Sequence, residues 1–252
     1  MNNLLEFEQL IEHYDQHFSG WDFAWISDTD RISSEPLNWS YTSLLLKHLP
    51  VSNCMLDMGT GGGEMLSMLR PLPAHTYATE AYAPNVILAR QRLEPLGVQV
   101  ETFQYDHELP FADHQFDLVI NRHESYDPAE LRRIMQSGSL FVTQQVGGQD
   151  CLDINTALDA PANSAFQYWN LDYAIKQLKE HDFRILRTEE QFPIQRFYDI
   201  GAVVYYLKAV EWQIDGFKPA FYMDRLYSIH LHMQSHGYWD VRQHRFLLMA
   251  TT

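Results

Sequence analysis

The sequence of 252 residues is long enough to bury one substantial hydrophobic core. Hydrophobic residues make up 46% of it and charged residues 20%, which is typical of a folded globular protein and excludes a disordered chain. The formal net charge is -15, with 18 lysines and arginines against 33 acidic residues. Because nucleic-acid binding relies on basic side chains that neutralise phosphates, this balance disfavours a nucleic-acid partner. It favours a small molecule or a protein side chain.

Three further features bear on location. The longest apolar run, residues 200–210, is interrupted by Lys208 and is too short to span a membrane. Residues 1–14 contain acids and no lysine or arginine, so they do not resemble the start of a secretory signal. Cys54 and Cys151 are too few for a disulfide framework. We therefore expect a cytoplasmic protein.

The first 50 residues predict two helices separated by an aromatic-rich stretch. Apolar residues at helical spacing indicate a helix over residues 4–18, and a second helix is expected over residues 40–49. The stretch between them contains Trp21, Trp25 and Trp39. We expect residues 1–39 to form a helical and aromatic N-terminal cap of a single domain that spans residues 1–252. Our hypothesis is that this cap closes over a bound ligand.

From residue 51 onward, short apolar strands alternate with helices. Pro84 and Asp127 stand where two of these helices should begin, and Gly97 and Gly138 where they should end. A further helix is predicted over residues 171–180. This alternation is typical of βαβ units and predicts an α/β domain with a mostly parallel sheet. The expected strands are residues 54–58, 76–79, 98–103, 116–120, 139–143, 183–188 and 245–250.

Residues 195–240, between the sixth and seventh predicted strands, read as a helical insertion. Ile200, Val203, Val204 and Leu207 form one apolar stripe at helical spacing. An insertion of this length adds packing to the sheet or covers the mouth of a ligand site. The sequence leaves both interpretations open.

A glycine-rich turn follows the first of these strands, in the run Asp57-Met58-Gly59-Thr60-Gly61-Gly62-Gly63. Glycines at alternate positions permit a tight turn and let a ligand approach the backbone closely. Asp57 narrows the choice of ligand. A carboxylate beside this turn would repel a pyrophosphate and would favour the ammonium and sulfonium charges of S-adenosylmethionine.

Two more acids stand at the ends of the next strands. Glu80 ends the second strand, where a carboxylate can accept both hydroxyls of a ribose. Asp106 follows the third strand, where it could accept from the amino group of an adenine. Because open α/β sheets bind ligands at the carboxyl ends of their strands, these acids and Asp57 predict one nucleoside-binding edge.

The run Asp57-x-Gly59-x-Gly61-x-Gly63 resembles the first motif of the class I S-adenosylmethionine-dependent methyltransferases, in particular the type 11 group. The segments 109–119 and 133–141 are similar to later parts of that family, although Gln136-Ser137-Gly138-Ser139 replaces its usual proline-glycine-glycine. The resemblance implies a Rossmann-like seven-stranded sheet of order 3-2-1-4-5-7-6, with strand seven antiparallel and helices on both faces. It implies S-adenosyl-L-methionine as cofactor and a methyltransferase activity. The cofactor-binding residues it implies are Asp57, Gly59, Thr60, Gly61, Gly63, Glu80, Ala81, Tyr82, Asp106, His107 and Asn121.

Methyl transfer mainly requires that the acceptor be held in line with the methyl group, and a base is needed where the acceptor must lose a proton. His123, in the loop after the fourth strand, is our candidate for a base or an acceptor-orienting group. Glu124 is a weaker candidate, because it could merely cap Arg122 or the next helix. We predict no metal site, since His230, His232 and His236 lack a third-ligand pattern.

Alternative functions remain open at this point. A nicotinamide or flavin oxidoreductase uses a similar glycine turn, but Glu64 stands where its third glycine belongs. A non-catalytic module that binds S-adenosylmethionine would have the same cofactor motif. A methyltransferase of ribosomal or transfer RNA is a further alternative, which the acidic composition disfavours.

Overall fold

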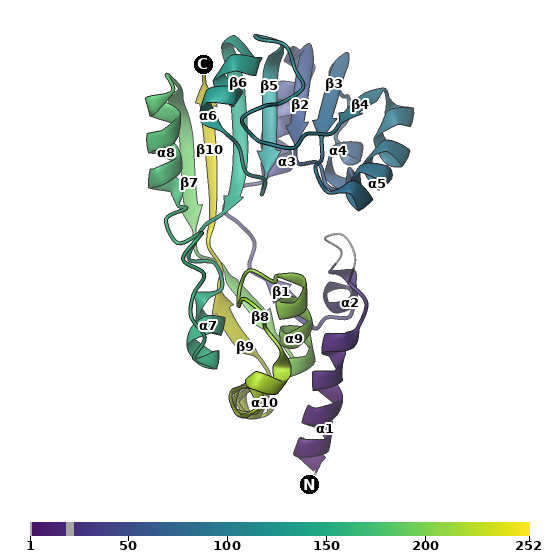
Figure 1. Cartoon of the computed structure of the whole chain (residues 1–252), viewed down its shortest axis with the longest axis vertical. Helices are drawn as coiled ribbons and strands as arrows, with labels where there is room; N and C mark the ends of the chain where they lie inside the picture. Colours follow the sequence, from purple (N-terminus) through teal and green to yellow (C-terminus); the bar gives the residue numbers. More distant parts are fainter. Residues whose placement is uncertain (1, 19–22) are drawn as a thin grey trace. The chain divides into compact units, whose positions relative to one another are not determined.

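The computed structural model describes residues 2–18 and 23–252, which fold as two compact units (Figure 1). The first, here called the sheet unit, comprises residues 38–146, 169–190 and 245–252. The second, the helical unit, comprises 147–168, 191–244 and the described residues of 1–37. None of the helices in these described ranges is long and apolar enough to cross a membrane.

The sheet unit is built on seven strands in the order β4-β3-β2-β5-β6-β10-β7, which run side by side in Figure 1. The neighbours from β4 to β6 are parallel, and β10 is antiparallel to β6. This order is the predicted 3-2-1-4-5-7-6, and the predicted Rossmann-like fold is therefore confirmed. The strands are β2 (Cys54–Met58), β3 (His75–Thr79), β4 (Val98–Glu101), β5 (Phe116–Arg122), β6 (Met135–Val146), β7 (Arg184–Gln191) and β10 (Arg245–Thr251).

Burial along the strands follows from their places in the sheet. All residues of β2 are buried, because it has a partner strand on each side and the domain covers both faces. The edge strand β7 instead alternates between exposed and half-buried residues. The apolar core of one face contains Leu56, Val119 and Phe141, from three neighbouring strands.

Helices of the sheet unit begin at the residues that the sequence marks. Ser40 and Asp127 accept hydrogen bonds from backbone N–H groups in the first turns of α3 and α6, and Pro84 lies in the first turn of α5. The helices are α3 (Tyr41–His48), α4 (Glu64–Met68), α5 (Ala83–Leu93), α6 (Pro128–Ile134) and α8 (Leu171–Glu180), with 3-10 turns at η2 (Leu49–Val51) and η3 (Glu94–Leu96).

The predicted boundary between α6 and the strand after it is wrong. The helix that was expected to run to Gly138 ends at Ile134, and β6 begins at once with Met135 in an extended conformation. The pairing of β5 with β6 shifts register across this stretch, from Phe116 opposite Met135 to Leu118 opposite Leu140. Gly138 lies inside this irregular part, where its φ of 75° suits glycine. The glycine therefore marks a bulge in the strand and not the end of the helix.

The helical unit contains a small antiparallel sheet that the sequence analysis did not identify. Its strands are β1 (Ile32–Ser34), β8 (Ile194–Phe197) and β9 (Trp239–Arg242), in the order β1-β8-β9. Three or four residues are too few to display the alternation that reveals a strand. The predicted insertion 195–240 therefore holds two strands besides its helices.

Helices pack around this small sheet. Nearly all of α9 (Ile200–Ala209) is buried, in a cluster that also includes Phe7 and Ile26. The predicted helix 4–18 is α1 (Asn2–Ile11) followed by a 3-10 turn, η1 (Glu12–Asp15). The N-terminal segment and the insertion thus contribute to one unit, and the idea that they cover a ligand stays a prediction. The remaining elements are α2 (Ala24–Ser27), α7 (Leu152–Leu158), η4 (Pro219–Phe221) and α10 (Met223–His236).

Candidate functional site

The predicted cofactor residues lie where four adjacent strands of the sheet unit end. β4, β3, β2 and β5 are neighbours, and all four are parallel. Their carboxyl ends therefore share one edge, to which Glu80, Asp57 and Asn121 belong. The sheet order thus brings together residues that are up to 64 positions apart in the sequence.

The glycine turn after β2 has the backbone conformation that its glycines allow. Gly59, Gly61 and Gly63 have φ angles of 67°, 63° and 80°, in the left-handed region. Apart from Gly61 itself and its two neighbours in the sequence, no heavy atom of the described residues lies within 4 Å of the position that a Cβ on Gly61 would take, so its backbone is open to a ligand. The N–H of Gly61 donates to Oε2 of Glu80 at 2.9 Å, and that of Thr60 to the carbonyl of Thr79 at 2.9 Å.

Glu80 is held by backbone donors on both sides. Its Oε2 accepts from Gly61, and its Oε1 accepts from the N–H of Tyr82 at 2.7 Å. The side chain is 7% exposed, and each carboxylate oxygen keeps a further lone pair. Ala81 and Tyr82 are exposed, with Tyr82 at 60%. The arrangement can accept hydroxyl donors beside an available aromatic ring.

Asp57 is almost fully enclosed, at 2% exposure, and accepts a hydrogen bond from the Thr60 hydroxyl at 2.7 Å. Burial raises the pKa of Asp57 to about 7, and the negative charge of Glu80 adds to the effect. The Thr60 hydrogen bond and the charge of Arg122 act in the opposite direction. A positive ligand group at this turn would favour the charged carboxylate.

Asp106 and His107 lie in a turn after β4, and side chains of α6 hold the segment that follows this turn. The N–H of Glu108 donates to the carbonyl of Tyr105 across the turn, and the exposed His107 ring stacks on Tyr105 with centroids 5.2 Å apart. Asp106 is half-buried. The charge of Asp106 raises the pKa of Glu124, which indicates that the two carboxyl groups lie near each other.

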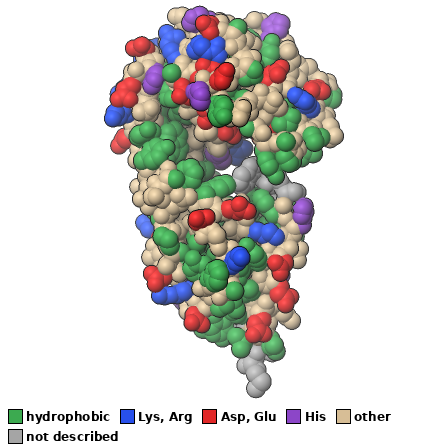
Figure 2. All heavy atoms as spheres, viewed as in Figure 1, with side chains coloured by type: hydrophobic (Ala, Val, Ile, Leu, Met, Phe, Trp, Pro, Cys, Tyr) green, Lys and Arg blue, Asp and Glu red, His purple; other side chains and the backbone are tan. Residues whose placement is uncertain are grey.

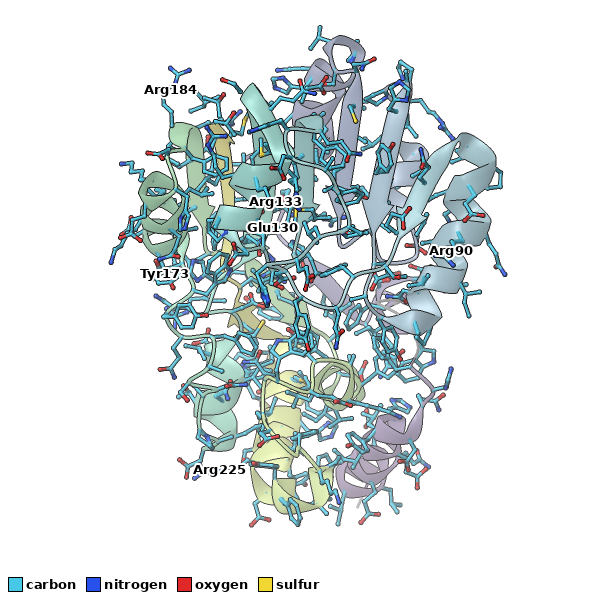
Figure 3. All side chains as sticks on the ribbon, turned by 45° about the horizontal axis from the view of Figure 1, so that its top comes forward. Arg90, Glu130, Arg133, Tyr173, Arg184 and Arg225 are labelled. Carbon is cyan, nitrogen blue, oxygen red and sulfur yellow. The ribbon has the colours of Figure 1, made fainter. Side chains whose placement is uncertain are left out.

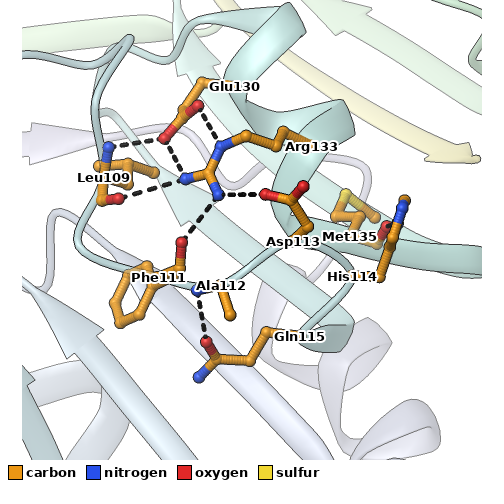
Figure 4. Close-up of polar contacts among 9 residues, drawn as sticks. All are labelled: Leu109, Phe111, Ala112, Asp113, His114, Gln115, Glu130, Arg133 and Met135. Atoms are coloured by element: carbon orange, nitrogen blue, oxygen red, sulfur yellow. Dashed lines mark hydrogen bonds and ion pairs between the residues drawn. The ribbon is translucent and has the colours of Figure 1, made fainter.

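The side chains that hold this segment are Glu130 and Arg133 of α6, which lie side by side in Figure 3. Arg133 forms ion pairs with Glu130 at 2.6 Å and Asp113 at 2.7 Å (Figure 4). It also donates to the carbonyls of Leu109 and Phe111, while Glu130 accepts from the N–H of Leu109 at 2.6 Å. These bonds fix the segment 109–113, which directly follows the turn that holds Asp106.

Asn121 is fully buried at the end of β5. Its Oδ1 accepts from Thr143 at 3.0 Å and from Gln145 at 2.7 Å, and its backbone carbonyl accepts from the Tyr41 hydroxyl at 2.9 Å. Its Nδ2 has no hydrogen-bond partner among residues 2–18 and 23–252. Gln145 also donates to the carbonyl of Glu124 at 2.9 Å. A buried polar network thus anchors the loop that carries His123.

Two neighbours determine which nitrogen of His123 carries the proton. The indole N–H of Trp39 donates to Oε1 of Gln144 at 2.9 Å, which turns the amide Nε2 toward His123 Nε2 at 3.2 Å. Since an amide nitrogen donates, His123 Nε2 accepts and the neutral ring carries its proton on Nδ1. The ring keeps exposed surface, yet burial lowers the pKa of His123 to about 3, helped by the charges of Arg122 and Arg245. The ring is therefore a neutral hydrogen-bond donor.

Glu124 lies against the glycine turn and does not cap the next helix. Its Oε2 is 2.5 Å from the position that a Cβ on Gly59 would occupy. Asp127, and not Glu124, caps α6. Burial raises the pKa of Glu124 to about 7, with contributions from the charges of Asp106 and Glu80. The sequence motif gave no sign of this contact.

Other features considered from the sequence lie elsewhere. Trp21 is outside the described residues. His232 and His236 stack with centroids 4.1 Å apart, and the described residues contain no group of three or more His, Cys, Asp or Glu that could hold a metal ion. A depression of about 250 Å³ lies at the opposite edge of the sheet, next to Asp117, whose oxygens accept from the backbone N–H groups of Asn53 and Cys54. That depression is remote from the glycine turn.

Comparison with known families agrees with this geometry. Residues 56–142, from β2 through most of β6, match the family described as a methyltransferase domain. The resemblance to methyltransferases that the sequence motifs indicate is therefore supported by a family match over this part of the chain. The match includes the glycine turn, Glu80, Asp106 and the loop of His123. A comparison with curated proteins gives no match.

Solved structures show a similar fold over most of the chain. A candidate methyltransferase from Bacillus halodurans C-125 is 14% identical, with a TM-score of 0.59, over 83% of this chain and 97% of that one. A protein of unknown function from Deinococcus radiodurans R1 is 13% identical, with a TM-score of 0.59, over 98% and 99%. Geranyl diphosphate methyltransferase in complex with S-adenosylmethionine is 14% identical, with a TM-score of 0.50, over 83% of each chain. At such identities these structures show the fold alone.

The residues that support His123 and Glu124 are not apparent from the sequence motifs. Trp39 belongs to the aromatic stretch and Tyr41 to the helix after it, yet both donate hydrogen bonds at the end of the sheet. A signal was present in β6, where Thr143-Gln144-Gln145 directly follows the apolar run Leu140-Phe141-Val142 in a buried part of the strand. Three consecutive polar residues in such a strand indicate a hydrogen-bonded network.

Proposed function

We propose that this protein is an S-adenosylmethionine-dependent methyltransferase that acts on a small-molecule acceptor. The convergence of Asp57, Glu80 and Asp106 around the turn Gly59–Gly63 carries the proposal. All three are carboxylates, and the nearby charge of Glu80 raises the pKa of Asp57. Such an edge suits a ligand with a positive charge and several hydroxyl or amino donors.

The residues present fit this cofactor better than a dinucleotide. The backbone at Gly61 is open, and Glu80 retains lone pairs for ribose hydroxyls after accepting its two N–H bonds. A half-buried carboxylate such as Asp106 can accept from an adenine amino group, and the exposed Tyr82 ring is available for stacking. A pyrophosphate would instead meet the carboxylates of Asp57 and Glu80 and be repelled.

S-Adenosylmethionine, when bound, supplies a methyl group on a positively charged sulfur. The chain's part is to hold the cofactor and the acceptor in line and to exclude wrong orientations. We assign His123 to orientation of the acceptor, because its free nitrogen carries a proton and its Nε2 already accepts from Gln144. A donor of this kind can hold an acceptor atom that has a lone pair.

A thermal-shift and calorimetric experiment tests cofactor use. S-Adenosylmethionine and S-adenosylhomocysteine should each raise the unfolding temperature, since a ligand at a hundredfold excess over its Kd adds about 2.7 kcal/mol of stability. NAD should leave it unchanged. Asp57→Ala and Glu80→Ala should weaken both effects while circular dichroism shows an intact fold. Stabilisation by NAD alone would overturn the proposal.

The acceptor class requires a turnover assay. Lysine and arginine side chains are scattered among acidic ones on the face shown in Figure 2, which supports a small molecule over RNA. Release of S-adenosylhomocysteine should therefore depend on a pool of small metabolites and not on added ribosomal or transfer RNA. Turnover with RNA alone would contradict the proposed small-molecule acceptor and would favour an RNA acceptor. Tight cofactor binding without turnover on any pool would favour a non-catalytic binding module.

A further inference from the structure

Glu124 occupies a place that a bare backbone leaves for a ligand. Its Oε2 lies 2.5 Å from where a Cβ on Gly59 would stand, so any side chain at position 59 would displace it. Gly59 is the first glycine of the turn, and Glu80 and Asp106, the proposed acceptors for ribose and adenine, both act on the Glu124 carboxyl. Glu124 therefore contacts the same surface as the proposed ligand.

The backbone of Glu124 is anchored, whereas its carboxyl group has mostly acidic neighbours. Gln145 donates to the Glu124 backbone carbonyl at 2.9 Å, and this bond fixes the backbone of the loop. The groups that act on the carboxyl are Glu80 from the end of β3, Asp106 from the turn after β4, and both the backbone N–H and the hydroxyl of Ser125 from its own loop. The Ser125 hydroxyl donates at 3.4 Å, a weak bond. Two negative neighbours and partial burial disfavour a third negative charge here.

We propose that Glu124 is a further cofactor-contacting residue that carries a proton in the empty site and releases it when the positively charged cofactor binds. This inference rests on the proposed function. The Oε–H bond breaks, the electron pair stays on the carboxylate, and the proton passes to the solvent buffer. The arriving sulfonium charge offsets the repulsion from Glu80 and Asp106, which makes the ionised form of Glu124 favourable.

Release of this proton should accompany binding of the cofactor but not of its product. S-Adenosylmethionine carries the sulfonium charge, whereas S-adenosylhomocysteine has a neutral sulfur. The ionisation of Glu124 should by itself raise the affinity for the charged form by about tenfold between pH 6 and pH 8, as expected for a carboxyl group with a pKa of about 7. Affinity for the neutral product should depend on pH much less. Glu124 would thus favour release of the product.

Calorimetric titration of the full chain tests this inference. S-Adenosylmethionine is titrated at pH 6.0 in phosphate and in an amine buffer, whose different ionisation enthalpies report the number of protons released. Asp57 has a raised pKa as well and contributes its own release, so the informative quantity is the difference between the wild type and Glu124→Gln. We expect the variant to release up to one proton fewer. The ratio of the variant's Kd to the wild-type Kd should rise by about tenfold between pH 6 and pH 8, because glutamine cannot ionise.

Glu108→Gln is the matched control, since Glu108 is an exposed acid in the turn of Asp106. It should release as many protons as the wild type. If S-adenosylmethionine binds and Glu124→Gln releases the same number of protons as the wild type, the inference is overturned and the proposed function stands. If the wild type does not bind S-adenosylmethionine, both are overturned.

Discussion

At the scale of single residues, the carboxylates of the site differ in what their surroundings supply. Glu80 accepts two backbone N–H groups, whereas Asp57 accepts the hydroxyl of Thr60 in an enclosed position. Enclosure raises the pKa of Asp57 from its usual 3.8 to about 7. Backbone donors thus hold the carboxylate of Glu80, whereas a positive ligand group would favour the charged form of Asp57.

The raised pKa of Asp57 predicts how the ligand-free protein responds to pH. A folded Asp57 keeps its proton up to about pH 7, while an unfolded one loses it near pH 3.8. Its contribution to stability is therefore complete at low pH and is lost as the pH rises through 7, by on the order of 3 kcal/mol between pH 5 and 8. Asp57→Asn should remove this loss. Urea unfolding of both proteins at pH 5 and pH 8 measures it, and equal pH dependence in the two would contradict the assignment.

The orienting role of His123 predicts a contrast between two replacements. His123 has a φ of 64°, which asparagine tolerates better than alanine, and an asparagine N–H can take the place of the Nδ1 proton. His123→Ala should lower kcat by about tenfold or more and leave the Kd of the cofactor unchanged. His123→Asn should recover most of kcat. If alanine turned over normally, His123 would have no part in the reaction.

At the scale of secondary-structure elements, α6 acts on the site from a distance through Arg133. Its bonds to Glu130, Asp113 and two carbonyls hold the segment after the Asp106 turn. Arg133→Gln should lower the free energy of unfolding by about 1–3 kcal/mol and weaken cofactor binding as well. Arg132→Gln, one residue away on the same helix, is the control. Denaturant unfolding measures the stability, and calorimetry measures the affinity for the cofactor. If Arg133→Gln lost stability but kept full affinity for the cofactor, α6 would have no influence on the site.

How far the sequence predicts the elements depends on the length of each pattern. Strand β2 and helix α8 were predicted with their observed boundaries, because a continuous apolar strand and an amphipathic helix both give clear periodic signals. Strands β1, β8 and β9 are too short for that. The contact between Glu124 and Gly59 joins residues 65 positions apart, and no local pattern predicts the direction of a side chain in a loop. Motif spacing therefore indicated the cofactor residues but not the groups that act on them.

At the scale of the whole molecule, the net charge of -15 should influence how charged ligands bind. An acidic protein attracts a cation over distances that salt shortens to about 10 Å at 0.1 M. Raising the salt from 0.05 to 0.5 M should therefore weaken S-adenosylmethionine several-fold more than S-adenosylhomocysteine, whose sulfur is neutral. Parallel titrations of both ligands provide the comparison. Identical salt dependence would mean that overall charge plays no part in selecting the cofactor.

The position of β10 has a consequence for biosynthesis. This strand is the last in the sequence, yet it lies between β6 and β7. A nascent chain that has left the ribosome as far as residue 244 therefore has β6 and β7 without the strand that separates them. Two open strand edges are sites for aberrant pairing between chains. The newly made protein should need protection, by chaperones or by speed of folding, until residues 245–251 emerge and close the gap.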